Sequence, residues 1–141
     1  MDLSVKNTLS VVIPTFNEEG NIELLYNKLK ETIDPLGLEA LELIFVDDGS
    51  HDDSLKIIKQ LAANDDQVKY ISFSRNFGHQ LALKAGLDHA RFKGIVSLDA
   101  DLQHPVDLIP DMIEKWRSGA DVVYSKRIDI TLPWFKRTSS K

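Results

Sequence analysis

Short apolar runs alternate with longer amphipathic stretches along most of the chain. Each run has the length and apolar character of a strand that packs into a core. The runs lie at residues 9–14, 41–46, 68–73, 95–98 and 120–124. Proline ends the first run, and an aspartate-rich turn follows the second. The pattern therefore predicts five strands.

Between these runs, apolar residues recur at helical spacing, which predicts four amphipathic helices. The first is expected over residues 19–33, and the second begins after a polar cap at Ser50 or Asp52. The third follows Gly78, and the fourth begins with Pro105 as its first residue. The apolar positions of the last helix are Leu108, Ile109, Met112, Ile113 and Trp116.

Strands that alternate with crossover helices predict an α/β fold of three layers, with helices on both faces of a mostly parallel sheet. Such Rossmann-like sheets bind ligands outside the carboxyl ends of their strands. Four polar clusters follow predicted strands: Pro14–Glu18, Asp47–Ser50, Ser74–Asn76 and Asp99–Asp101. We therefore expect clusters that are far apart in the sequence to meet at one edge of the sheet.

Asp99 and Asp101 follow the fourth predicted strand and are separated by the small Ala100. Carboxylates one residue apart in an extended chain project to the same side, where their charges repel each other. A divalent cation removes this repulsion, and carboxylate oxygens suit Mg²⁺ or Mn²⁺. Gln103 could add a neutral oxygen ligand. In the simpler interpretation, the two aspartates only end the strand and Gln103 caps the next helix.

Composition narrows the classes of function. The 141 residues carry a net charge of −5, which argues against a nucleic-acid-binding surface. There is no cysteine, so the chain offers neither a disulfide nor a thiolate metal site. The N-terminus lacks the features of a signal peptide, and no apolar run approaches the roughly 20 residues of a membrane span. These features predict a soluble domain.

Five ordered blocks carry a resemblance that is much more specific than one pair of aspartates. The blocks are Val12–Glu19, Val46–Ser50, Ser74–Gly78, Ala85–Leu87 and Asp99–Pro105. Together they resemble the inverting family 2 glycosyltransferases of the GT-A fold, most closely the branch of dolichol-phosphate mannose synthase and bactoprenol glucosyltransferases. The resemblance implies transfer of a sugar from a UDP- or GDP-sugar to a polyprenyl phosphate or a saccharide, with inversion and with help from Mg²⁺ or Mn²⁺.

The resemblance also implies roles for individual residues. Those that match substrate-binding positions are Pro14, Phe16, Glu18, Phe45, Asp47, Ala100 and Arg127. Those that match metal-binding positions are Asp99, Asp101 and Gln103. Phe45 and Asp47 match positions near the base, and Arg127 matches a basic residue near the phosphates. The Ser74–Gly78 block resembles that of bacterial UDP-sugar users, which favours uracil over guanine.

Several of these residues also have simpler interpretations. Glu18 could complement a helix dipole, and Phe16 could belong to the core. We assign Asp47 to the base and Asp48 to the turn or to support of the site.

Three further polar residues lie in or near the matching blocks. Arg75 fits a ligand phosphate and a neighbouring aspartate equally well. His79 and His104 have no partner at metal-ligand spacing, so we interpret them as surface or helix-start residues.

In this family the general base and most of the acceptor site follow the Asp-x-Asp half, so no catalytic base is assigned. We expect a donor-binding domain in residues 1–127 and a tail, residues 128–141, that leads toward a missing acceptor region. Such a piece would bind the nucleotide sugar and transfer it poorly or not at all. Trp134 and Phe135 could face a membrane interface or a partner. The whole protein is expected in the cytoplasm, at the cytoplasmic face of the membrane.

Two other classes of function compete with this one. A non-catalytic nucleotide-binding module could use the same pocket, although it would not need a pair of metal-binding aspartates. A nucleotidyltransferase would need a glycine-rich, basic loop after the first strand, whereas residues 15–19 are acidic.

Overall fold

The computed structural model describes residues 7–103, 105–121 and 123. Its strands are β1 (Thr8–Thr15), β2 (Ala40–Asp47), β3 (Val68–Ser72) and β4 (Gly94–Ser97). All pairs are parallel, and the order in the sheet is β3-β2-β1-β4. Four of the predicted strands are thus confirmed. The strand predicted at 120–124 is not: Ala120, Asp121 and Val123 are not in a strand, and residues 122 and 124 lie outside the described part.

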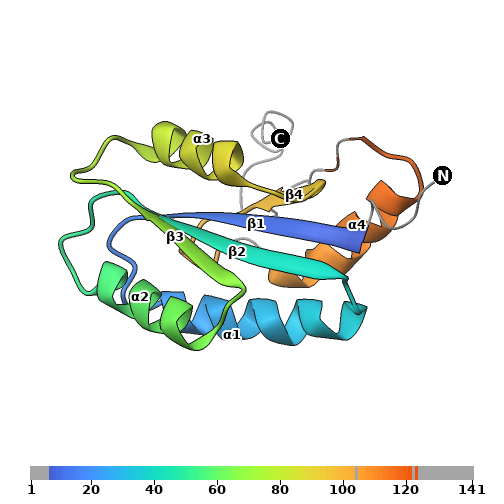
Figure 1. The fold of residues 1–141 in the computed structure, drawn as a ribbon, viewed down its shortest axis with the longest axis horizontal. Helices are drawn as coiled ribbons and strands as arrows, with labels where there is room; N and C mark the ends of the chain where they lie inside the picture. Colours follow the sequence, from blue (N-terminus) through green and yellow to red (C-terminus); the bar gives the residue numbers. More distant parts are fainter. Residues whose placement is uncertain (1–6, 104, 122, 124–141) are drawn as a thin grey trace, which may run out of the picture.

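The helices are α1 (Ile22–Ile33), α2 (Ser54–Asn64), α3 (His79–His89) and α4 (Ile109–Arg117). Short 3-10 helices, η2 (Asp34–Leu36) and η3 (Val106–Leu108), follow α1 and precede α4. Figure 1 shows α3 on one side of the sheet and α1 and α2 on the other. Side chains of α4 share one core with those of α1. The predicted three-layer α/β/α architecture is confirmed.

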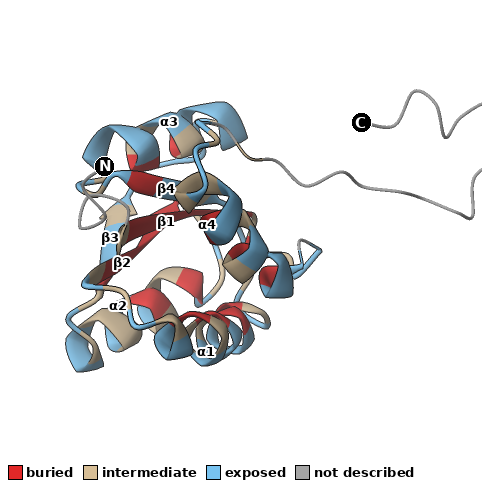
Figure 2. Cartoon of the chain, turned by 90° about the vertical axis from the view of Figure 1, so that its right-hand side faces the viewer, coloured by how far each residue is buried: buried red, intermediate tan, exposed pale blue. Residues whose placement is uncertain are grey.

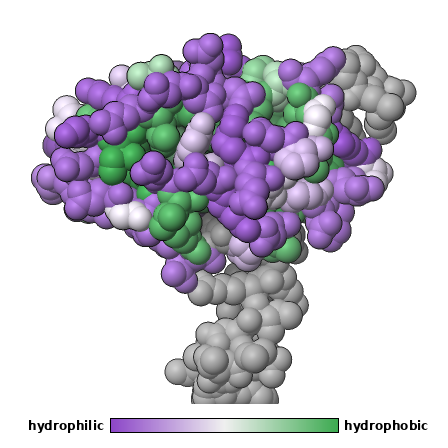
Figure 3. Space-filling view, turned by 90° about the horizontal axis from the view of Figure 1, so that it is seen from below, coloured by the Kyte–Doolittle hydropathy of each residue, from purple (hydrophilic) through white to green (hydrophobic). Residues whose placement is uncertain are grey.

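The central strands β1 and β2 are buried on both faces, whereas the edge strands β3 and β4 are partly exposed (Figure 2). Leu43 and Phe45 of β2 face the α1 and α2 layer, whereas Ile44 and Val46 face α3. Over α1 and α2 the outer surface is mostly hydrophilic, with apolar residues in separate patches (Figure 3). None of the described helices is long and apolar enough to cross a membrane.

Helix α3 packs on β1 and β2 through its smallest residues. Ala82 and Gly86 are its buried positions, and a Cβ at Gly86 would lie 2.2 Å from Cγ1 of Val12. The larger Leu81 and Leu87 are exposed. Close approach of the backbone at Gly86, together with the partly buried Leu83 and Ala85, therefore holds α3 against the sheet.

The start of the last helix differs from the prediction. Pro105 precedes η3 rather than beginning a helix, and Pro110 lies in the first turn of α4. A proline is tolerated there because the first N–H groups of a helix have no intrahelical partner. Of the predicted inner face, Ile109 and Ile113 are buried, whereas Leu108 is 36% exposed.

The buried carboxylate of Glu42 lies near the amino ends of the strands. Glu42 accepts hydrogen bonds from the Ser10 hydroxyl (2.6 Å), from the Arg91 backbone N–H (2.8 Å) and from Arg91 Nε (3.1 Å). Burial raises the pKa of this carboxyl, but the hydrogen bonds outweigh burial and lower the pKa below its ordinary value. Glu42 therefore fixes the loop that connects α3 with β4.

Candidate functional site

A cleft of about 290 Å³ lies at the carboxyl ends of the strands. Here the sheet order changes direction, because β2 lies on one side of β1 and β4 on the other. Such a switch point is where open α/β sheets bind ligands. The residues that line the cleft are Pro14, Thr15, Phe16, Glu18, Asp48, Asn76, Gly78, His79, Ala82, Asp99, Ala100 and Asp101. The predicted meeting of the four polar clusters is thus largely realised.

The two aspartates of the Asp-x-Asp motif lie on one wall of this cleft. Asp99 Oδ1 is 2.7 Å from Nε2 of His79, the first residue of α3. Asp101 Oδ1 accepts the backbone N–H of Gln103 at 3.0 Å. Ala100 between them is buried in the core that includes Leu98 and Val106, and it also contributes to the lining of the cleft. His79 does begin a helix, as predicted, but its contact with Asp99 was not anticipated.

Asp48 holds the loop that leads into α3. Its buried carboxylate accepts the backbone N–H groups of Phe77 (2.7 Å) and Gly78 (3.2 Å), and the Asn76 amide (3.2 Å). The neighbouring Gly49 has φ +71°, and a Cβ there would lie 2.3 Å from the Arg75 carbonyl carbon. Asp48 was predicted to shape the turn or to support the site, and its hydrogen bonds hold the start of α3 beside the cleft.

Arg75 forms no ion pair with an aspartate among the described residues, and its Nη1 donates to the Asn76 carbonyl at 3.3 Å. The ligand phosphate stays a prediction. The Arg75 guanidinium lies 3.9 Å from the centre of the Phe77 ring, a cation–π contact. Phe77 in turn packs edge-on against Phe73, with ring centres 5.5 Å apart. Arg75 is exposed beside the loop and does not line the cleft.

The loop after β1 is joined to the loop after β2 by hydrogen bonds in both directions. The N–H groups of Asn17 and Glu18 donate to the hydroxyls of Ser50 (2.9 Å) and Ser54 (2.8 Å). In return, Asn17 Oδ1 accepts the His51 N–H at 2.8 Å. The two loops therefore form one framework at the edge of the cleft.

Phe16, which the sequence predicted to bind substrate, belongs to the first of these two loops. Phe16 is 41% exposed, so it is not a core residue, and its ring packs edge-on against His51 at 6.2 Å. Glu18 is half-buried, and its carboxylate accepts the Asn21 side-chain amide at 2.7 Å. Pro14 is buried at the end of β1.

Two residues predicted to lie near the base do not line the cleft. Phe45 is fully buried in the core on the side of α1 and α2. Asp47 is buried at the end of β2, where its Oδ2 accepts the Ser50 N–H at 3.3 Å. Its Oδ1 is buried without a hydrogen-bond partner among the described residues. A buried carboxylate oxygen in this condition can accept a hydrogen bond from a ligand.

The donor set at the motif suits a hard divalent cation. Asp99 and Asp101 offer carboxylate oxygens, the ligands that Mg²⁺ and Mn²⁺ prefer. No group of three His, Cys, Asp or Glu residues that could hold a metal occurs in the described part of the chain. The pair would thus hold a cation that takes its other ligands from water or from a bound phosphate. Gln103 is exposed and does not line the cleft, and Arg127 lies outside the described residues.

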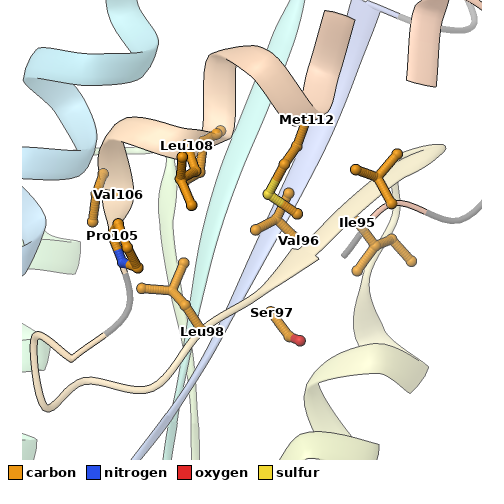
Figure 4. Close-up of a pocket in the computed structure, with 10 residues that line it drawn as sticks. Ile95, Val96, Ser97, Leu98, Pro105, Val106, Leu108 and Met112 are labelled. Carbon is orange, nitrogen blue, oxygen red and sulfur yellow. The ribbon is translucent and has the colours of Figure 1, made fainter. Parts of the chain in front are cut away.

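An apolar hollow of about 270 Å³ lies between β4 and α4 (Figure 4). Val96, Leu98 and Met112 are among its lining residues, and Ser97 brings a hydroxyl. It contains no ionisable side chain among its described lining residues, so it offers little chemistry. The cleft at the aspartates is the better candidate site.

The parallel sheet with helices on both faces is an α/β fold of the GT-A type, with the cleft at its switch point. The profile of the Glycosyl transferase family 2 matches residues 10–141, and the chain belongs to this family. Among curated relatives, YkcC of Bacillus subtilis, an uncharacterized glycosyltransferase, is 51% identical over 84% of this chain and 36% of its own length. A prophage bactoprenol glucosyl transferase homolog of Escherichia coli is 42% identical over 94% of this chain and 46% of its own length.

Solved structures of the same fold carry ligands. Glucosyl-3-phosphoglycerate synthase from Mycobacterium tuberculosis, in complex with Mn²⁺, UDP and glucosyl-3-phosphoglycerate, aligns with a TM-score of 0.62 and 28% identity. The alignment covers 80% of this chain and 40% of that one. The present chain thus spans less than half the length of the relatives described here.

Proposed function

We propose that this chain forms the donor-binding part of an inverting glycosyltransferase that uses a nucleotide-diphosphate sugar and Mg²⁺ or Mn²⁺. One observation carries the proposal. The lining of the cleft combines an exposed aromatic ring, Phe16, with the carboxylates of Asp99 and Asp101. The aromatic ring suits a nucleoside base, and the two carboxylates suit a metal-bound diphosphate.

In this proposal the base lies against Phe16, whose exposed ring offers an apolar face for stacking. Asp47, which does not line the cleft in this structure, stays the predicted acceptor for an N–H group of the base, and its Oδ1 has no hydrogen-bond partner among the described residues. Uracil and guanine both carry such a group, and the resemblance favours uracil. Glu18 and Pro14 complete the nucleoside side of the cleft. Phe45 supports this wall from the core.

The diphosphate then lies beside Ala100, with Asp99 and Asp101 as the residues that hold the cation. When bound, the cation supplies positive charge that stabilises the leaving diphosphate. The two carboxylates fix the position of this charge, because they lie in the turn that follows β4. Gln103 and Arg127 stay predicted participants, the first as a metal ligand and the second near the phosphates.

The acceptor is proposed to be a polyprenyl phosphate, with a saccharide as the alternative. The E. coli relative is a bactoprenol glucosyl transferase homolog, which supports the lipid and a location of the whole protein at the cytoplasmic face of the membrane. The general base and the acceptor site are proposed to lie after residue 127, so no catalytic base is assigned in the cleft.

Titration calorimetry with UDP, with Mn²⁺ and with EDTA, tests the proposal. We expect UDP to bind more tightly with Mn²⁺, and Asp101→Asn to abolish most of this gain. Asp111→Asn, an exposed carboxylate on α4, is the matched control and should leave it unchanged. Equal affinity with Mn²⁺ and with EDTA would contradict the metal-dependent site. Absence of binding in both would contradict the proposed function as a whole.

A further inference from the structure

His79 stands out among the residues of the cleft because the proposed function gives it no role. It is the first residue of α3, it lines the cleft, and its side chain contacts the first aspartate of the Asp-x-Asp motif. Nε2 lies 2.7 Å from Asp99 Oδ1. A carboxylate has no proton to give, so the imidazole donates this hydrogen bond.

The position of His79 is fixed from two directions. Before it, the N–H groups of Phe77 and Gly78 are held by the buried Asp48 carboxylate. After it, α3 is seated on β1 through Gly86, which leaves no room for even a methyl group beside Val12. A shift of His79 would therefore disturb the hydrogen bonds of Asp48 or the packing of α3.

Carboxylates that bind metals are commonly oriented by a hydrogen bond from a residue that does not itself touch the metal. His79 makes such a hydrogen bond to Asp99. We propose that His79 is a positioning residue that orients Asp99 for the cation of the nucleotide-sugar site, an inference that rests on the proposed function. His79 connects α3 to Asp99, and α3 in turn follows the loop that Asp48 holds.

The size of the effect follows from the exposure of the pair. Loss of such an outer partner typically costs 10- to 100-fold in metal affinity. The side chains of His79 and Asp99 are 57% and 38% exposed, so water can replace part of the hydrogen bond. We therefore expect a loss near the lower limit, about tenfold.

The test uses the ratio of the UDP dissociation constant in EDTA to that in Mn²⁺, measured by calorimetry on the 141-residue chain. This ratio isolates the contribution of the metal from that of the base. His79→Ala should lower the ratio about tenfold and leave the constant in EDTA unchanged. His79→Gln should restore most of the loss, because its amide nitrogen can reach the place of Nε2. His79→Asn should not, since its shorter side chain stops nearer the backbone.

The control is His89→Ala, the same substitution at an exposed histidine of the same helix, which should leave the ratio unchanged. An unchanged ratio in His79→Ala would overturn the inference while leaving the proposed function intact. A higher ratio would also overturn it, because His79 would then compete with the cation for Asp99. A wild-type chain that binds no UDP would contradict both the inference and the proposed function.

Discussion

Removal of the Asp48 carboxylate is expected to destabilise the chain more than any other single change in its loops. The side chain is 3% exposed and accepts hydrogen bonds from the N–H groups of Phe77 and Gly78 and from the Asn76 amide. Hydrogen bonds to charged groups contribute about 1.5–3 kcal/mol each. Phe77 is 41% exposed, so water will replace part of what Asp48→Ala removes. We expect the free energy of unfolding to fall by about 2–4 kcal/mol.

Urea denaturation followed by circular dichroism measures this loss. Asp48→Asn keeps one oxygen acceptor, enough for the N–H of Phe77, and should lose about 1–2 kcal/mol. Asp53→Ala, an exposed carboxylate in the same loop whose side chain does not cap α2, is the control. Asp48→Ala within about 0.5 kcal/mol of the wild type would refute the reasoning, because that is the range of ordinary surface substitutions.

The remaining predictions concern packing and pH. Gly86→Ala should lower the free energy of unfolding by about 1–3 kcal/mol, because its Cβ would overlap Val12. Gly20→Ala is the control and should change this free energy little, because nothing lies within 4 Å of a Cβ there. Equal thermal midpoints for the two variants would contradict the close packing of α3 on β1. Glu42 has a lowered pKa, so its contribution to stability is fully present above the ordinary value of 4.5 and is lost as the pH falls through the lowered pKa. The stability difference between wild type and Glu42→Gln should therefore shrink below pH 4.5, and a difference that grows there would contradict this account.

Much of the fold could be predicted because the two central strands, β1 and β2, are buried on both faces. Continuous apolar runs such as residues 41–46 are recognisable without any tertiary information. Helix α1 was predicted from residue 19 but begins at Ile22, because Glu19 belongs to the loop, where its N–H donates to Asp52. Helix propensity could not indicate that residues 19–21 are needed to join two loops.

The apolar residues of α3 indicated a helix but not how it packs. Its leucines at 81 and 87 are exposed, and the contact with the sheet is made by Ala82 and Gly86. Close packing of this kind depends on the shape of the facing strand, here Val12 of β1. The pattern of hydrophobic positions in the helix alone does not contain that information.

The candidate site could be predicted as a set of loops but not as a set of contacts. The rule that ligands bind at the carboxyl ends of parallel strands brought Phe16 and the two aspartates to one edge. The same rule could not tell that Phe45 faces the layer of α1 and α2, because residues 41–47 of β2 are all buried and their pattern does not distinguish the two faces. The contact between His79 and Asp99 spans two segments and depends on the position of α3.

The central claim is that Asp99 and Asp101 hold a cation together with a nucleotide. Paramagnetic broadening in the ¹H–¹⁵N spectrum of the 141-residue chain tests it most directly, with UDP saturating, Mn²⁺ substoichiometric and Mg²⁺ as the diamagnetic reference. The account predicts that Mn²⁺ broadens the amide signals of Ala100 and Gly78 and spares that of Phe92, in the loop at the far end of the sheet. An unaffected Ala100 signal, or broadening centred away from the cleft, would contradict the claim.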